Sequence, residues 1–158
     1  MKKMKIYLDS SVISHLEALD TPEKMQDTVG LWVDIKVGEY DIVLSEMVFV
    51  EIDRCHNPKR DMLYHSLSEI EYTTIEINDE VEKIAEQIIS LGILKRNSID
   101  DCTHIACAIF SGCNYLVSWN FKHMVNVKTI NGVRAITNLN GYNSIDIITP
   151  SMLVCRED

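Results

Sequence analysis

Short apolar segments alternate with helix-like segments along most of the chain, and this alternation constrains the fold more than any other feature. The segments expected to be strands are residues 5–9, 41–45, 72–77, 115–118 and 144–148. Between them, apolar side chains recur at helical spacing, most clearly over residues 81–89. Strands that alternate with helices form βαβ units with right-handed crossovers. The sequence therefore predicts an α/β fold with a mainly parallel central sheet covered on both faces.

Local signals place the helices between these strands. Pro22 suits the first turn of a helix, where its missing N–H is not needed, and Asn78 is a favourable N-cap. Ser10 or Ser11 is expected to cap the first helix. Residues 72–77 are expected to form a strand at or near a sheet edge. Helices are expected at residues 12–19, 22–38, 46–55, 59–67, 79–92, 100–112, 132–139 and 150–154.

Length and cysteine content indicate one domain in a reducing compartment. The 158 residues contain no linker, repeat or low-complexity tract, so residues 1–158 are expected to form a single domain. Residues 1–11 hold too few apolar side chains for a signal peptide or a membrane span. The five cysteines include no C-x-x-C pair and no zinc-finger spacing. Free thiols and a cytoplasmic protein that does not bind membranes are expected.

The net charge of −9 at pH 7 limits the range of binding functions. Nucleic-acid-binding proteins usually present a basic surface. The acid excess therefore argues against broad, non-specific binding of nucleic acid. It is less of an obstacle if several carboxylates gather in one site and a metal ion neutralises them.

Acidic and amide side chains fall where an α/β fold binds its ligands. In open parallel sheets, ligands bind outside the carboxyl ends of the strands. Asp9 ends the first strand, and Asn120 follows the strand at residues 115–118. Glu51 lies on the helix after the second strand, and Asp101 begins the helix before residues 115–118. The folded chain is therefore expected to bring these four side chains to one edge of the sheet.

Three or four such groups at one sheet edge suit a hard divalent cation. Mg²⁺ and Mn²⁺ prefer carboxylate, carbonyl and water oxygens. These ions activate water and stabilise the charge that develops on phosphate oxygens. Clustered carboxylates repel one another unless a cation is present, so a function is the usual reason to gather them.

Each of these acidic side chains also has a structural interpretation. Asp9 could be a helix N-cap or a turn residue, and Glu51 could be a solvated carboxylate on a helix surface. Asp101 lies three residues after Ser98, which is the spacing of a capping box. These alternatives stay open on the sequence alone.

Four neighbouring residues have structural interpretations as well. Asp100 suits a helix N-terminus through the helix dipole. His104 follows Asp101 by about one helical turn and is expected to be a satisfied, partly buried histidine rather than a ligand. Ser118 and Asn120 could simply form a turn.

Four segments of the chain resemble the PIN-domain family in their order and spacing. They are YLDSSVIS, LSEMVFVEIDR, DDCTHIACAIFSGCNYLVSWNFKHM and IITPSML, and together they span essentially the whole chain. The resemblance implies a three-layer α/β/α sandwich. It also implies a Mg²⁺- or Mn²⁺-dependent ribonuclease, often the toxin of a toxin–antitoxin pair. An RNA substrate, an antitoxin partner and a homodimer are expected on the same ground.

The resemblance assigns residues to the metal site. In that family an Asp ends the first strand, a Glu lies on the helix after the second strand, and an Asp begins a D-x-x-H-I-A-like helix. These positions match Asp9, Glu51 and Asp101, which are the implied metal ligands. A fourth acid usually follows the next strand, but here Asn120 stands in that place without a charge. One tightly held ion is expected, with a second recruited by the substrate phosphate.

The implied mechanism gives each residue a role. Asp9 and Asp101 coordinate the ion directly or through water, and Glu51 binds it or positions the attacking water. Asn120 orients that water or completes the ligand shell. Supporting roles are expected for Ser10, Asp100 and Ser118. Candidate contacts to the RNA backbone are Lys95, Arg96 and Lys122.

Other functional classes remain as alternatives. A PIN-like fold that serves as a non-catalytic nucleic-acid-binding or scaffold module is favoured by Asn120 and by the charge of −9. A phosphatase with an Asp nucleophile would need a second Asp two residues after Asp9, where this chain has Ser11. A receiver domain would need an acidic pair, a central Asp and a late Lys at a strand end, a set that the sequence lacks.

Overall fold

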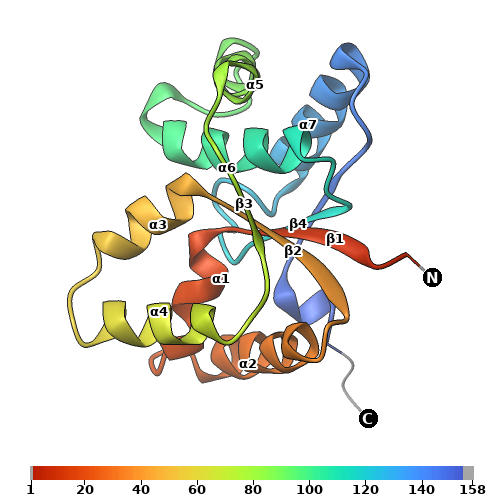
Figure 1. Cartoon of the computed structure of the whole chain (residues 1–158). Coiled ribbons are helices and arrows are strands. Elements are labelled where there is room, and N and C mark those ends of the chain that lie inside the picture. The colour runs from red at the N-terminus through yellow and green to blue at the C-terminus, as the bar shows by residue number, and fades with distance from the viewer. Residues whose placement is uncertain (1, 155–158) are drawn as a thin grey trace.

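The computed structural model describes residues 2–154, in which five parallel strands form one sheet in the order β3-β2-β1-β4-β5 (Figure 1). Every neighbouring pair of strands is parallel. All five predicted strands are present, and the strand expected near a sheet edge is the edge strand β3. The strands are β1 (Met4–Leu8), β2 (Tyr40–Ser45), β3 (Thr73–Ile75), β4 (Tyr115–Val117) and β5 (Asp146–Ile148).

Helices cover both faces of this sheet (Figure 1). One face carries α1 (Ser10–Ser14), α2 (Pro22–Lys36), α3 (Glu46–Asp53) and α4 (Lys59–Ser68). The other face carries α5 (Asp79–Ser90), α6 (Ile99–Phe110) and α7 (Val127–Asn140). The predicted three-layer α/β/α sandwich with a parallel central sheet is therefore confirmed.

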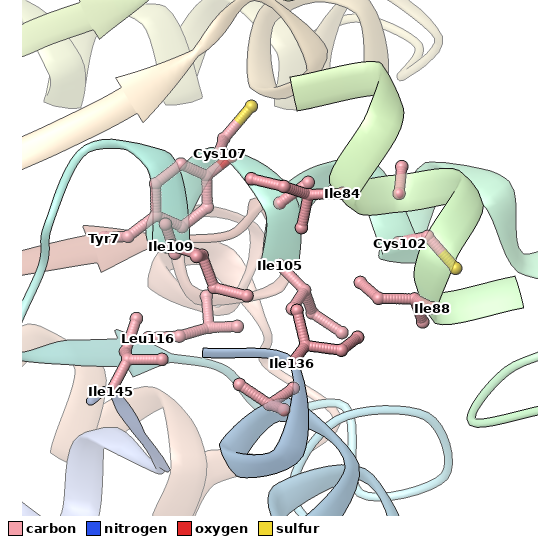
Figure 2. Close-up of a cluster of buried hydrophobic side chains, with 14 of the residues drawn as sticks. Tyr7, Ile84, Ile88, Cys102, Ile105, Cys107, Ile109, Leu116, Ile136 and Ile145 are labelled. Carbon is pink, nitrogen blue, oxygen red and sulfur yellow. The ribbon is translucent and has the colours of Figure 1, made fainter. Parts of the chain in front are cut away.

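Alternate residues of the strands pack into two separate cores. On β1, Tyr7 lies in the core between the sheet and α5, α6 and α7, whereas Ile6 and Leu8 lie in the core on the opposite face. All three side chains are fully buried. Figure 2 shows the first core, where side chains of α5, α6, β4 and α7 converge with Tyr7. A buried phenol needs a hydrogen-bond partner, and this need leads to the candidate site.

Helix α7 begins earlier than the sequence indicated. Asn126 caps it, and the side-chain oxygen of Asn126 accepts a hydrogen bond from the backbone N–H of Thr129. The helix therefore starts at Val127 rather than near Gly132, and its first turn holds the apolar Val127 and Ile130 beside the polar Lys128 and Thr129. Gly132 allows close packing: a Cβ there would lie 2.5 Å from Ile93 Cγ1. This approach holds the loop before α6 against α7.

The described cysteines are free thiols, as predicted: Cys55 is half-buried, and Cys102, Cys107 and Cys113 are buried. Cys155 lies outside the described residues. Among residues 2–154, no helix has the length and apolar character needed to cross a membrane. The cytoplasmic location and the single-domain extent stay predictions.

Candidate active site

The carboxylate of Asp9 is buried just past the carboxyl end of the central strand β1, with 3% of the residue exposed. It caps α1, so Ser10 is the first helical residue rather than the cap. Ser11 Oγ donates to Asp9 Oδ1 at 2.5 Å, and Ser118 Oγ donates to Asp9 Oδ2 at 2.5 Å. The contact with Ser118 forms because β1 and β4 are paired neighbours. Asp9 is therefore both a helix cap and a buried carboxylate held on both oxygens.

A chain of hydrogen bonds connects Glu51 with the interior of the sheet. His104 Nε2 is bonded to Glu51 Oε1, and His104 Nδ1 lies 2.7 Å from Tyr7 Oη. Tyr7 Oη in turn lies 2.7 Å from Ser45 Oγ. His104 has hydrogen-bond partners at both ring nitrogens, as expected, but at 2% exposed it is fully rather than partly buried. In the imidazolium form both ring nitrogens donate. Nδ1 would then donate to Tyr7 and Nε2 to Glu51, and the two bonds together fix the orientation of the ring.

Charge and burial shift the pKa values of this group. Burial lowers the pKa of His104, but the hydrogen bond with Glu51 and nearby carboxylate charges raise it, with a net increase. Those charges belong to Asp9, Glu51 and Asp101. Burial raises the pKa of Glu51, but the hydrogen bond and charge of His104 outweigh it and the net pKa is lowered. Burial raises the pKa of Asp9, and His104 and the hydrogen bonds offset only part of the increase.

A second histidine contacts Asp101. His123 Nδ1 lies 2.7 Å from Asp101 Oδ2, and their side chains are 31% and 23% exposed. Asn120 Oδ1 accepts a hydrogen bond from the backbone N–H of His123 at 3.0 Å. The amide oxygen of Asn120 therefore holds the turn that positions this histidine, and its role toward water stays a prediction. Ser98 makes no side-chain cap on α6, so the capping-box interpretation of Asp101 does not hold.

Two of the supporting residues lie at the margin of the site. Asp100 Oδ2 lies 3.1 Å from Arg54 Nη1, an exposed ion pair that connects α6 with the end of α3. The hydroxyl of Ser10 is buried and makes no hydrogen bond of normal geometry. It nevertheless lies near enough to Glu51 to contribute to the lowered pKa of that carboxylate.

The three candidate RNA contacts separate into two groups. Lys95 and Lys122 line one cavity together with Lys128, which the sequence did not single out. The two terminal guanidinium nitrogens of Arg96, Nη1 and Nη2, donate to Glu86, each at 2.7 Å. The charge of Arg96 is therefore already balanced.

The structure brings together side chains from three distant segments. Asp9, Glu51 and Asp101 all lie close enough to His104 for their charges to raise its pKa. Within residues 2–154, no three His, Cys, Asp or Glu side chains are spaced to hold a metal ion. The oxygen donors nevertheless have the chemistry that Mg²⁺ prefers, and the unpartnered hydroxyl of Ser10 adds another such oxygen. By donor chemistry, the residues fit a hard cation.

Sequence reasoning missed four residues that organise these carboxylates. Tyr7 and Ser45 read as ordinary strand residues, and only the folded chain shows that they bond in a row with His104. Ser11 appeared only as a candidate cap. His123 carried a signal that could have been used, since it stands three residues after Asn120 in the WNFKHM segment.

Comparisons with known proteins bear on the fold. No family model and no curated protein sequence matches the chain. Among solved structures, a chain of the crystal structure of VapBC2 from Rickettsia felis bound to a DNA fragment from their promoter is similar. The TM-score is 0.53 and the sequence identity 14%, over 92% of this chain and 98% of the other. At this identity the likeness concerns the fold alone, and by its fold the chain is PIN-like.

Proposed function

We propose that the chain is a Mg²⁺- or Mn²⁺-dependent endoribonuclease of the PIN-domain type. The observation that carries this proposal is the placement of three carboxylates at the carboxyl edge of the sheet: Asp9 is buried at the end of β1, Glu51 bonds to His104, and Asp101 lies one helical turn before His104 on α6. Carboxylates held close together repel one another unless a cation balances them. Histidines contact Glu51 and Asp101, but Asp9 is held only by two hydroxyl groups and a backbone N–H, so the site favours additional positive charge.

The oxygen donors of the site fit a hard divalent ion by their chemistry. Asp9 and Asp101 would hold the ion directly or through water, and Glu51 would bind it or position a water molecule. When bound, the ion would supply a water of lowered pKa and positive charge at the phosphate oxygens.

The protein's own residues orient the three carboxylates before any substrate arrives. Ser11 and Ser118 hold the two oxygens of Asp9. Histidines hold one oxygen of Glu51 and one of Asp101. The lowered pKa of Glu51 keeps it ionised at neutral pH, which is the form that accepts a hydrogen bond from an attacking water. Such preorganised groups lose little freedom at the moment of reaction.

The proposed partners are an RNA substrate, an antitoxin protein and a second copy of the chain. The similar solved structure is VapBC2 bound to a fragment of promoter DNA, which supports a partner protein and contact with nucleic acid. Size-exclusion chromatography with light scattering tests the homodimer. Co-expression with the product of the adjacent reading frame tests the antitoxin, which is expected to co-purify and to suppress cleavage.

A non-catalytic PIN-like binding or scaffold module is the second candidate. It is favoured by the spacing of the site, because within the described part of the chain no three ligand side chains are set for a metal. The amide oxygen of Asn120 is also engaged in a turn. Mn²⁺ titration separates the two candidates, since a metal that binds the folded protein must raise its melting temperature.

The decisive experiment is cleavage of single-stranded and structured RNA with Mn²⁺ or Mg²⁺. Asp9→Asn and Asp101→Asn are expected to abolish cleavage. Asp79→Asn is the matched control, because Asp79 lies in the first turn of α5 as Asp101 does in α6, but at an exposed position. If the wild type and both site variants cleave equally, or if none cleaves any RNA, the nuclease proposal is wrong.

A further inference from the structure

A cavity of about 310 Å³ lies beside the candidate site and has an unusual charge. It is formed by the loop before α6, the turn after β4 and the start of α7. The charged side chains that line it are all basic or ionisable to a cation: Lys95, Lys122, His123 and Lys128. No carboxylate lines it, although the chain has a net charge of −9.

The lysines of this cavity, Lys95, Lys122 and Lys128, are free to bind a ligand. None of the three forms an ion pair with another residue in the range 2–154. Other lysine-lined cavities differ, because the one at the amino edge of the sheet also contains Asp41, Glu69 and Glu71. The positive charge of the lysine cavity is therefore not offset by carboxylates in its lining, as it is in the other cavity.

The position of the lysine cavity connects it with the carboxylates. His123 lines the cavity and also bonds to Asp101 through Nδ1 at 2.7 Å. The packing of Ile93 against Gly132 holds the loop that carries Lys95 close to the first turn of α7, where Lys128 lies. The positive end of the α7 dipole adds to the potential of the lysines. Only the side chain of His123 would separate an anion in this cavity from Asp101.

We propose that the lysine cavity is a phosphate subsite for the RNA backbone and that it binds a phosphate next to the one cleaved. Naming RNA as the ligand rests on the proposed function. Phosphate contacts fix the register of a nucleic acid on a protein without reading its sequence. The subsite would thus place the neighbouring phosphodiester against Asp101. It also shows how an acidic protein can bind RNA, with its positive charge confined to the place where the strand must lie.

Binding without cleavage tests the subsite. A fluorescent single-stranded RNA is titrated in EDTA, without divalent ions, over a series of KCl concentrations. Each phosphate contact that is lost reduces the salt dependence of binding to a single strand by about 0.7 in the slope of log K against log salt. A variant with Lys95→Gln, Lys122→Gln and Lys128→Gln loses the one phosphate of the subsite and is expected to reduce that slope by about 0.7.

The matched control removes the same number of charges elsewhere. It carries Lys2→Gln, Lys3→Gln and Lys59→Gln, none of which lines the lysine cavity. Its slope is expected to equal that of the wild type. Equal slopes for the wild type and the cavity variant overturn the subsite, as does a cavity variant that loses affinity for polyglutamate but not for RNA.

The failure of the subsite can be told from the failure of the nuclease. Asp101→Asn is expected to keep the wild-type slope and lose cleavage. If the wild type binds RNA with the full slope but never cleaves it, the nuclease proposal fails and the subsite stands. If the wild type cleaves RNA and the cavity variant cleaves it with the same KM, the subsite fails and the nuclease proposal stands.

Discussion

Two carboxylate–histidine pairs lie at the same edge of the sheet in different surroundings. In the inner pair, His104 is 2% exposed and bonds to Glu51, whose side chain is 28% exposed, and its other ring nitrogen bonds to Tyr7. In the outer pair, His123 bonds to Asp101, is 31% exposed, and lines the lysine cavity. The same two functional groups thus form a fixed internal element in one place and an accessible one in the other.

This difference in the burial of the histidine predicts that the two pairs contribute differently to stability, although their residue types are alike. Breaking a buried pair leaves a charge without compensation, which is strongly destabilising. A partly exposed pair is screened by water and contributes little to stability. The inner pair is therefore expected to support the fold and to orient Glu51. The outer pair is expected to serve the substrate, because its histidine reaches the surface.

The largest expected effect is on the inner histidine. His104→Ala is expected to lower the free energy of unfolding by about 3 kcal/mol, because a cavity replaces the buried imidazole and the buried hydroxyl of Tyr7 loses a hydrogen bond. His123→Ala is expected to lower it by about 1 kcal/mol or less. Urea denaturation at neutral pH measures both. Equal losses for the two variants would break the comparison.

The next effect concerns the phenol that supports the inner pair. Tyr7→Phe is expected to lower the free energy of unfolding by about 2 kcal/mol, because His104 and Ser45 each lose a buried hydrogen bond. Tyr64→Phe is the matched control, since the hydroxyl of Tyr64 donates to Asp53 at 2.5 Å in an exposed setting. The control is expected to cost about 0.5 kcal/mol. A similar loss in both variants would mean that the buried hydrogen bonds of Tyr7 stabilise the fold no more than the exposed hydrogen bond of Tyr64.

The inner pair should also make stability depend on pH. The pKa of His104 is raised above its ordinary value of 6.5, so the folded state binds more protons than the unfolded state. This stabilisation is fully present below about pH 6.5 and is lost as the pH rises through the folded pKa. The free energy of unfolding is expected to fall from pH 6 to pH 9 in the wild type and in His123→Gln, and to fall less in His104→Gln. The same fall in all three proteins would contradict the prediction.

The smallest effect is expected at the exposed ion pair beside the site. Arg54 and Asp100 have side chains that are 61% and 41% exposed, so solvent and salt screen their attraction. Arg54→Ala is expected to change the free energy of unfolding by about 0.5 kcal/mol or less. A loss comparable with that of His104→Ala would mean that an exposed ion pair stabilises the fold as much as the inner pair does, which would contradict the role given to burial.

Much of the fold could be predicted because parallel strands are buried on both faces. Such strands read as continuous apolar runs, so residues 41–45 and 115–118 were recognised within one residue at either end. The start of α7 was missed, because its first turn holds only two apolar side chains, Val127 and Ile130, and its cap, Asn126, belongs to a loop. Local signals identify a helix end only when the cap and the apolar stripe coincide.

The site was less predictable because its contacts join distant segments. The sequence indicated which carboxylates lie at the sheet edge, since strand ends converge there. It could not indicate that His104 would bond to Glu51, or that Tyr7 and Ser45 would continue the row, because these contacts depend on strand order and side-chain direction. The engagement of Arg96 by Glu86 was hidden for the same reason. Contacts between side chains of distant segments are set by the tertiary structure, so local sequence patterns do not reveal them.

The two oxygens of Asp9 are held by parts of the chain that are made at different times. Oδ1 is contacted by Ser11 and by the backbone of Val12, which follow Asp9 directly in the sequence. Oδ2 is contacted by Ser118, which lies 109 positions later. During translation, β1 and α1 therefore emerge from the ribosome long before β4 can pair with β1. A site built in this order is complete only when most of the chain has been synthesised. Shortened or half-made chains would lack it.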